Sequence, residues 1–337
     1  MKIIKISMFA YFLTICGMSA FFSSISKNVN AETKLTLVYP FPDFLQYTKN
    51  CKALVAAINK RGKGLIKIDV LPFNSIKMFQ QAPAVSKGRV DLNCIPAAFY
   101  ARAIPELEAV STASSSIEQA RKSGGIDMLD KLQQKHFKVK YLGWTGDGNK
   151  FRFYMRDTPK FASNGLVDFK GLKLRGNPIY GAFIEAMGGT QHSLPATATY
   201  GALEKGVVDA AAWATIGLRG LKWDKMLRHA VEPDFYATDL GWIMNLKKWN
   251  GLSKEAQNIL QSTVMEFELS NRDLLSKMHK EEKAALLKGG MKFHKVPNPD
   301  KYLKLAVDSA YQRMIARLKK AKRSTDHVAK LRAAWQQ

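Results

Sequence analysis

The chain has 337 residues and a formal net charge of +24, with 46% hydrophobic and 24% charged residues. This composition is ordinary for a globular protein, and no segment after residue 31 is apolar enough to cross a bilayer. The length is sufficient for two core-bearing lobes, because single cores tend to split near 250–300 residues.

The first 31 residues have the pattern of a secretory signal peptide. Lys2 and Lys5 precede an acid-free apolar run over residues 6–22, and a Val-Asn-Ala tripeptide ending at Ala31 suits a signal peptidase. A retained membrane anchor is the alternative, but the apolar run is short for a spanning helix. We therefore expect an exported, periplasmic protein that begins at Glu32. Its formal charge would fall by three, from +24 to +21, because the segment holds three lysines and no acids.

The excess of basic residues is compatible with two kinds of partner, a polyanion such as nucleic acid or a small anion. The basic residues are dispersed, apart from a cluster between Arg317 and Arg323, and no zinc-finger, RNA-binding or helix-turn-helix signature accompanies them. Together with export, this dispersal argues against a nucleic-acid partner.

Strands and helices alternate in the first part of the mature chain. We predict strands over residues 34–39, 65–71, 90–95 and 137–144, and helices over residues 45–60, 77–86 and 117–135. This alternation indicates a parallel sheet flanked by helices. Ligands gather where the strands of such sheets end, so the candidate binding residues here are Phe41, Asn74, Phe99 and Trp144.

Two cysteines remain after export, Cys51 in a predicted helix and Cys94 in a predicted buried strand. Export permits a disulfide between them. Their positions nevertheless lead us to expect two free buried thiols, and the sequence leaves the pairing open.

A short pattern recurs in the two halves of the chain. Residues 86–91 (SKGRVD) are echoed 118 residues later by residues 204–209 (EKGVVD), each between a helical segment and an apolar strand. The alternative is that so short a match arose by chance. Taken with the repeated strand–helix runs, it suggests two lobes of similar construction that face a ligand-binding cleft.

The segment after residue 171 carries a candidate anion site. A short strand over residues 172–174 leads to Arg175, and a helical run over residues 179–187 follows, with Asn177 as the expected N-cap and Pro178 in the first turn. A guanidinium beside free backbone N–H groups suits a carboxylate or a phosphate. The alternative is that Arg175 pairs with an acid of the protein itself.

The longest predicted helix covers residues 254–288, capped by Ser253 and stopped by Gly289-Gly290. At 1.5 Å per residue it exceeds ~50 Å, which is enough to run along both lobes.

No motif for catalysis or metal binding stands out. The six histidines include no pair at metal-binding helical spacing, and the chain has no nucleophile elbow, P-loop or GxGxxG sequence. We therefore expect a binding protein rather than an enzyme, with no catalytic residues, no metal ligands and no cofactor. The sequence leaves open whether a metal ion binds together with the ligand.

Residues 168–175 (DFKGLKLR) and 200–209 (YGALEKGVVD) resemble the signature of the DctP-type solute-binding proteins, which serve tripartite ATP-independent periplasmic (TRAP) transporters. The resemblance extends over most of the mature chain. It implies an α/β fold of the periplasmic-binding-protein type, with two lobes around a central ligand cleft, crossing strands and a long helix that spans both lobes. We assign residues 32–150 and about 240–290 to lobe 1 and about 151–239 to lobe 2, with residues 291–337 packing on the lobes.

The resemblance also implies which residues contact the ligand. Arg175 occupies the position of the main contact, which forms a two-pronged salt bridge with the carboxylate of an organic acid. Arg152 best matches a second arginine on the preceding strand, with Arg156 as the rival. Trp213 matches a pocket position just past the Val-Asp strand, and Asp239 matches a polar position that could accept a hydrogen bond from a ligand hydroxyl.

Ala196 stands where the family often has an aromatic residue, which leaves more room for the ligand. The resemblance therefore predicts the extracytoplasmic solute-binding subunit of a TRAP transporter, for a monocarboxylate that carries a bulky or aromatic tail. The protein would capture this acid by an arginine–carboxylate salt bridge and hinge closure, and deliver it to membrane permease subunits. We expect a monomer. The alternatives are a sensor-type binding protein for an organic acid and an exported enzyme on a two-lobed fold, and the sequence does not name the acid.

Overall fold

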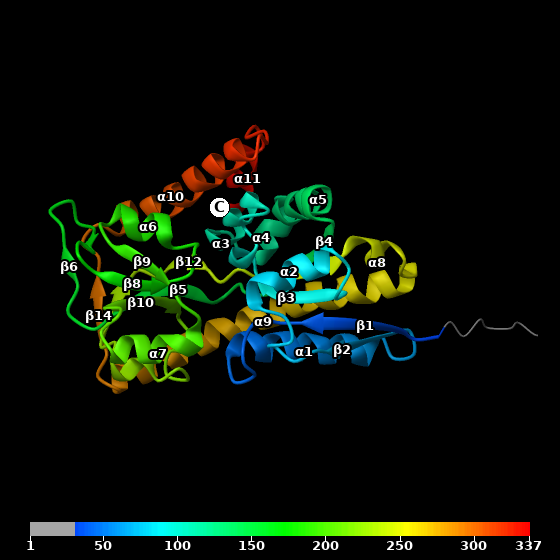
Figure 1. The fold of residues 1–337 in the computed structure, drawn as a ribbon, viewed down its shortest axis with the longest axis horizontal. Helices are drawn as coiled ribbons and strands as arrows, with labels where there is room; N and C mark the ends of the chain where they lie inside the picture. The colour runs from blue at the N-terminus through cyan, green and yellow to red at the C-terminus, as the bar shows by residue number, and fades with distance from the viewer. Residues whose placement is uncertain (1–30) are drawn as a thin grey trace, which may run out of the picture. The chain divides into compact units, whose positions relative to one another are not determined.

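Two mixed β-sheets organise the part of the chain that the computed structural model describes, residues 31–337 (Figure 1). Residues 32–337 form one compact unit. The signal peptide predicted for residues 1–31 lies, apart from Ala31, outside the described residues. Each sheet carries its own helices, so the fold is the predicted α/β fold of two lobes. The residue limits proposed for the lobes stay a prediction.

The first sheet contains the strands predicted in the first part of the chain and one strand from further on. Its spatial order is β2 (Ile66–Val70), β1 (Thr33–Val38), β3 (Leu92–Pro96), β13 (Leu240–Asn245) and β4 (Val139–Trp144). The predicted parallel arrangement is confirmed for β1, which pairs in parallel with β2 and β3. β13 is antiparallel to both of its neighbours, β3 and β4.

The second sheet holds the strand that ends near Arg175. Its order is β14 (Lys292–Lys295), β11 (His229–Glu232), β5 (Lys150–Met155), β10 (Ala210–Ala214), β8 (Lys173–Gly176) and β9 (Thr190–Ser193), and β12 (Phe235–Ala237) also pairs with β5. β8 runs parallel to β9 and β10, whereas β5 runs antiparallel to β10 and β11. A small separate hairpin joins β6 (Lys160–Phe161) to β7 (Val167–Asp168).

The described chain has eleven α-helices. They are α1 (Gln46–Arg61), α2 (Met78–Ser86), α3 (Glu108–Ser111), α4 (Ile117–Lys122), α5 (Gly125–Phe137), α6 (Gly181–Ala186), α7 (Ala196–Glu204), α8 (Leu246–Asn250), α9 (Lys254–Lys288), α10 (Pro299–Lys320) and α11 (Val328–Trp335). The single helix predicted over residues 117–135 is wrong. Gly124 adopts a left-handed φ of 78° and separates α4 from α5, and this conformation is readily available only to glycine.

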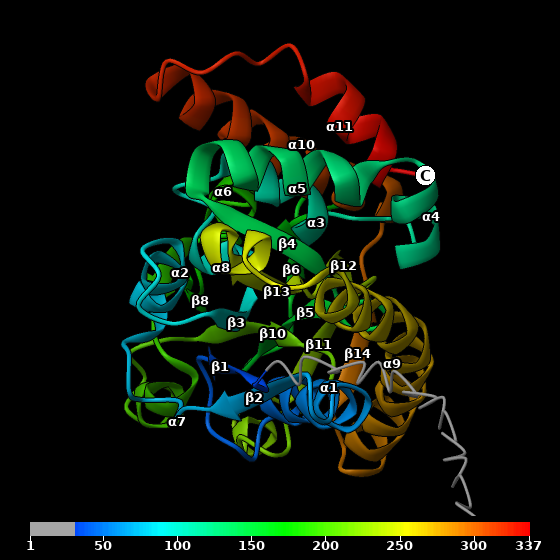
Figure 2. The ribbon, with the colours of Figure 1, turned by 90° about the vertical axis from the view of Figure 1, so that its right-hand side faces the viewer.

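The long helix α9 has the predicted bounds. The side chain of Ser253 caps it by accepting a hydrogen bond from the backbone N–H of Ala256. Figures 1 and 2 show α9 running past both sheets. Asn271 donates a hydrogen bond to the carbonyl of Thr145, beyond β4, and Glu282 forms an ion pair with Arg219, beyond β10. One rigid element therefore contacts both halves of the fold.

Two extended segments connect the sheets, in addition to α9, which leads from the first sheet to β14 of the second. The chain leaves the first sheet after β4, enters the second with β5, and returns between β12 and β13. The backbone N–H of Thr238 donates to the carbonyl of Asn149, and its hydroxyl donates to the carbonyl of Gly146. A Cβ atom at position 146 would lie 2.0 Å from the carbonyl oxygen of Thr238, so this close approach of the two segments requires glycine. The crossings therefore lie side by side, as expected of a hinge.

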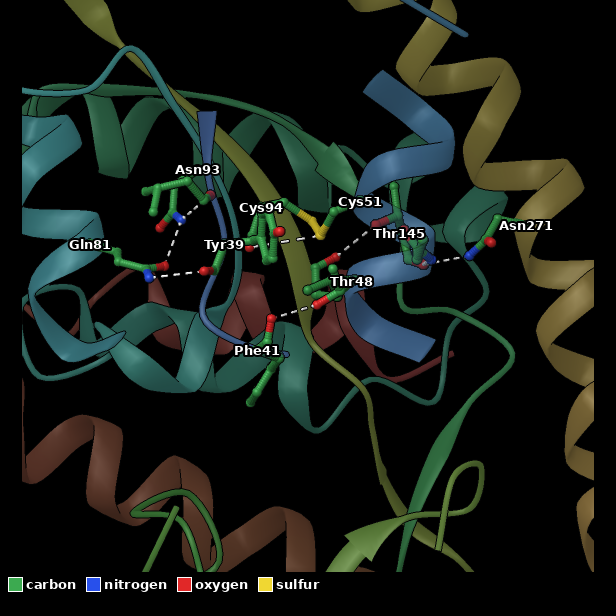
Figure 3. Close-up of a disulfide and its surroundings, with 12 residues drawn as sticks. Tyr39, Phe41, Thr48, Cys51, Gln81, Asn93, Cys94, Thr145 and Asn271 are labelled. Carbon is green, nitrogen blue, oxygen red and sulfur yellow. Dashed lines mark hydrogen bonds between the residues drawn. A yellow bond between two sulfur atoms is a disulfide. The ribbon is translucent and has the colours of Figure 1, made fainter. Parts of the chain in front are cut away.

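The expectation of two free thiols is wrong, because Cys51 and Cys94 form a disulfide (Figure 3). Helix α1 packs against the first sheet so that the Cα atoms of the two cysteines lie 5.9 Å apart, within the range that a disulfide spans. Hydrogen bonds nearby hold the loop after β1. Thr48 donates to the carbonyl of Phe41, and Gln81 donates to the carbonyl of Tyr39. The disulfide thus lies beside the loop that positions Phe41.

None of the helices within residues 31–337 combines the length and apolar character that a bilayer-spanning helix needs.

Candidate functional site

Arg175 is a buried cation whose partners are all neutral. It lies near the end of β8 with 5% of its surface exposed. Its Nε and Nη2 donate to the carbonyl of Leu194, and its Nη1 donates to the carbonyl of Ala212. The indole rings of Trp213 and Trp223 lie 5.2 and 5.3 Å from the guanidinium carbon. Within residues 31–337 no carboxylate forms an ion pair with Arg175.

The guanidinium has capacity for a further acceptor. Arginine has five N–H donors, and three of those of Arg175 are used in the bonds to carbonyl oxygens. One donor remains on each terminal nitrogen. Burial without a counter-charge lowers the pKa of Arg175 to about 10, so the group stays charged at neutral pH. A buried, charged group with free donors is costly unless an anion joins it.

A cavity of about 70 Å³ opens beside Arg175. Both sheets contribute side chains to its wall, and so do loops at their ends. It is lined by Phe41, Tyr47, Met78, Phe79, Pro96, Phe99, Phe151, Arg175, Gly176, Asn177, Pro178, Tyr180, Ser193, Leu194, Pro195, Ala196, Trp213 and Asp239. Six of the nine predicted site residues are therefore brought together here: Arg175, Trp213, Asn177, Asp239, Phe41 and Phe99.

Aromatic rings form a continuous series from the surface to the guanidinium. The order is Phe79, Phe99, Phe41, Tyr47, Trp213 and then Arg175, with centroid separations of 5.0, 5.7, 5.0 and 6.1 Å between successive rings. Phe79 at the outer end is 48% exposed, whereas Trp213 at the inner end is 5% exposed. The series gives the cavity an apolar wall with its one cation at the buried end.

Asp239 is the single carboxylate on the cavity lining. It follows β12 in the returning crossing segment and is 2% exposed. Its Oδ2 accepts hydrogen bonds from the backbone N–H of Ala98 and the hydroxyl of Ser111, both at 2.7 Å. Burial raises the pKa of Asp239 to about 6, against the lowering effect of these bonds. Within residues 31–337 no group of three or more histidine, cysteine or acidic side chains is arranged to hold a metal ion.

Asn177 lines the cavity but does not cap a helix. Helix α6 begins only at Gly181, with Tyr180 at its N-cap position, and no side chain caps it. The amide oxygen of Asn177 instead accepts a hydrogen bond from the backbone N–H of Ile179. The predicted helix N-terminus beside Arg175 is therefore wrong, because residues 177–180 form a turn and α6 has only six residues.

Arg152 does not reach this cavity. It is 1% exposed, and its Nε lies 2.5 Å from Asp234 while its Nη2 lies 3.4 Å from Glu232. These acids flank the turn between β11 and β12, which pair with β5, so the strand that carries Arg152 brings its counter-ions alongside. Arg152 lines a different cavity, of about 820 Å³. Its rival Arg156 donates to the carbonyl of Leu203 and is also absent from the Arg175 cavity.

Two other predicted site residues, Trp144 and Asn74, also do not line the Arg175 cavity. Trp144 is fully buried, donates its indole N–H to the carbonyl of Thr238 and packs on Trp335. Asn74 is exposed and lies outside the cavity lining. Trp144 is the last residue of β4 and Asn74 follows β2, but the side chain of Trp144 is buried in the core and that of Asn74 is exposed to solvent.

Sequence reasoning missed Tyr47 and Tyr180, whose rings line the cavity. Burial raises the pKa of both phenols, so they remain neutral donors. Tyr47 lies in the first turn of α1, six residues after Phe41, and this proximity to a predicted site residue is the one local signal that could have identified it. No comparable signal marks Tyr180.

Solved structures share this fold at low sequence identity. A TRAP periplasmic solute-binding protein from Desulfovibrio salexigens with bound orotic acid has a TM-score of 0.76 and 15% identity, with 90% of this chain and 99% of that chain covered. A TRAP solute-binding protein from Bordetella bronchiseptica, with calcium and picolinate bound in its active site, also has a TM-score of 0.76. It is 21% identical, with 91% of both chains covered.

Curated relatives that match part of this chain are also named as solute-binding proteins. A monocarboxylate 2-oxoacid-binding periplasmic protein from Nostoc sp. is 30% identical over 135 residues, which are 38% of this chain and 36% of that protein. The chain matches less than half the length of the curated relatives that it resembles. The model of the DctP family, the bacterial extracellular solute-binding proteins of family 7, matches residues 42–318. Because this match covers most of the chain, the protein belongs to the DctP family of bacterial extracellular solute-binding proteins.

Proposed function

We propose that the protein is the extracytoplasmic solute-binding subunit of a TRAP transporter and that it captures a small monocarboxylate on Arg175. The observation that carries this proposal is the guanidinium itself, which is 5% exposed, has no acidic partner within residues 31–337 and keeps one free donor on each terminal nitrogen. The two oxygens of a carboxylate are suited to two such donors. A lysine ammonium would lack this planar, two-pronged geometry.

The size of the cavity favours a compact acid. One water molecule needs about 10–15 Å³ of cavity volume, so the 70 Å³ beside Arg175 hold roughly five water-sized groups. An acid of three or four carbons fits these dimensions. The Nostoc relative is named for monocarboxylate 2-oxoacids, and this class supplies a second oxygen next to the carboxylate for neutral donors such as Tyr47. A bulky or aromatic tail, in contrast, exceeds the space as it stands.

Hinge closure provides the capture step. The cavity draws its wall from both lobes, and the crossing segments at residues 145–149 and 238–239 allow one lobe to rotate against the other. Closure buries the ligand against Tyr47 and Phe41 on one side and Arg175 on the other, and the closed form is then recognised by the membrane permease. In this proposal the exported protein is monomeric, acts in the periplasm after signal-peptide cleavage, and neither requires a cofactor nor changes its ligand.

Calorimetric titration of the mature protein with pyruvate, 2-oxobutyrate and lactate tests the proposal. Arg175→Ala should fold and lose about 30-fold or more in affinity, because truncating one member of a buried charge pair costs about 2–5 kcal/mol. Arg175→Lys should lose most of this affinity as well. Arg219→Lys is the matched control, since Arg219 is half exposed and pairs with Glu282 away from the cavity. Equal affinity in Arg175→Ala and the wild type would refute the carboxylate anchor, and a changed ligand recovered after incubation would indicate an enzyme.

A further inference from the structure

A second cavity lies directly against the Arg175 cavity. It measures about 480 Å³, and three residues, Phe79, Phe99 and Pro178, line both spaces. The partition between them is therefore a single layer of side chains. The inner cavity contains the anion-binding guanidinium, and the outer one has several times its volume.

The partition is weakly held at Phe79. Its ring is 48% exposed and touches Phe99 edge-on at 5.0 Å, in the first turn of α2. Phe99 lies in a three-residue 3₁₀ turn. Because about half of the surface of Phe79 is already exposed, outward rotation costs less buried apolar area than it would for a core phenylalanine. Rotation of Phe79 would join the two spaces.

The wall of the outer cavity is mainly apolar. Its charged residues are two arginines, Arg102 and Arg317, and one acid, Glu108. Phe137, Pro83 and Ile179 contribute apolar surface. Arg102 is exposed and forms no ion pair within the described part of the chain, while Arg317 shares Glu108 with Arg313. This excess positive charge attracts anions to the cavity from solution.

We propose that the outer cavity is a subsite for the apolar tail of a longer carboxylic acid whose head binds Arg175. The tail of such an acid extends beyond the inner cavity, which holds roughly five water-sized groups, and passes between Phe79 and Phe99. The protein would thus accept linear monocarboxylates with longer chains than the compact acids of the proposed function. This inference rests on that proposed function. Phe79 acts as the gate that sets the length at which the tail enters the outer cavity.

Chain-length titrations of the full mature protein test the subsite. Linear monocarboxylates from propionate to decanoate are titrated calorimetrically into the wild type, Ala103→Leu and Ala103→Phe. Ala103 lines the outer cavity and not the inner one, and it is exposed, so a larger side chain fills the outer space without touching Arg175. Ala53→Phe, at an exposed position of α1 outside both linings, is the matched control.

In the wild type, each methylene that enters the outer cavity should raise the affinity about four-fold, which corresponds to 0.8 kcal/mol per buried CH₂. Ala103→Leu should reduce this gain and Ala103→Phe should abolish it, while propionate binds all four proteins within about two-fold. Longer acids that bind no better than propionate, or an equal gain in the wild type and Ala103→Phe, would overturn the subsite and leave the proposed function intact. Absence of binding by every acid, propionate and the 2-oxo acids included, would overturn both.

Discussion

The phenol ring of Tyr47 on α1 lies edge-on to the indole ring of Trp213 on β10, with their centroids 6.1 Å apart. Helix α1, which carries Tyr47, packs against the first sheet, whereas Trp213 lies in the second sheet. This contact therefore joins the two lobes beside the Arg175 cavity. Trp213 also lies over the guanidinium of Arg175. The same indole ring therefore takes part in the contact between the lobes and packs against the guanidinium of Arg175.

A double-mutant cycle on this pair should show coupling in ligand affinity. Aromatic pairs contribute about 0.5–1.5 kcal/mol beyond the area that they bury. Tyr47→Ala and Trp213→Ala are each expected to weaken binding, and the double variant should lose less than the sum by about 1 kcal/mol. Isothermal titration with pyruvate measures the cycle. Tyr47→Phe keeps the ring and should retain the coupling, whereas additive losses would show that the two rings act independently.

The position of Arg175 was predictable because its signal is local. A short motif of basic and apolar residues, 168–175, contains both the arginine and the start of its strand, and Arg175 lies near the end of β8. The bounds of α9 were predictable for the same reason, because a serine cap and a glycine pair lie next to the helix that they delimit. Neither feature depends on a contact with a distant segment.

Features that depend on distant segments were not predictable. The counter-ions of Arg152 lie 80 and 82 residues further along the chain, and no spacing rule connects them to β5. Cys51 and Cys94 are 43 residues apart and meet only because α1 packs against the first sheet, of which β3 is part. Burial of both cysteines was anticipated correctly, but burial alone does not distinguish a thiol from a disulfide.

The buried carboxyl of Asp239 predicts a dependence of stability on pH. Burial raises its pKa from 3.8 to about 6 in the folded protein. Below about pH 4 the group is protonated in both the folded and unfolded chain, so it imposes no penalty. As the pH rises from about 4 to about 6, stability is lost, because over this range the unfolded chain releases the proton while the folded chain retains it, and above this range the penalty stays constant. A difference of about two pKa units corresponds to about 3 kcal/mol.

Asp239→Asn should therefore unfold at higher urea concentration than the wild type at pH 8, with little difference at pH 4. Ligand binding adds a second readout, since an anion in the cavity favours the neutral form of Asp239. The affinity of the wild type for pyruvate should rise as the pH falls from 8 to 5.5, and that of Asp239→Asn should change much less. If the affinities of the two proteins changed with pH in the same way, Asp239 would not be the group that titrates between pH 5.5 and 8.

The disulfide should stabilise the fold without contributing to the site. Cys51 and Cys94 close a loop with a sequence separation of 43 residues, for which the chain-entropy model gives about 4 kcal/mol. A double variant, Cys51→Ala with Cys94→Ala, is expected to lose stability of this order in urea unfolding. Its affinity for pyruvate should stay close to that of the wild type, because neither cysteine lines the cavity. Reductant should shift the unfolding curve of the wild type toward that of the variant, and coincident curves under all conditions would contradict a stabilising bond.

Arg313 on α10 links the turn after β8 to helix α3. Its Nε and Nη2 form ion pairs with the fully buried Glu108, at 2.9 and 2.5 Å, and it also donates to the carbonyls of Pro178 and Ile179. Pro178 lines the cavity three residues after Arg175. The guanidinium thus ties the turn after β8 to α3, and only its planar fork can serve the carboxylate and both carbonyls together.

Arg313→Ala is expected to destabilise the protein by about 1.5–3 kcal/mol, because Glu108 loses its hydrogen bonds from Arg313 while, among the described residues, Arg317 still pairs with its buried charge. Arg313→Lys retains the charge but not the fork, so it should preserve more stability and still weaken pyruvate binding, since the turn beside Arg175 loses its anchor. Lys304→Ala on the same helix is the control. Lys304 is 74% exposed and pairs with Asp308, and such a surface pair contributes at most about 1 kcal/mol. If Arg313→Lys bound pyruvate as tightly as the wild type, the contacts with the two carbonyls would have no part in holding the site.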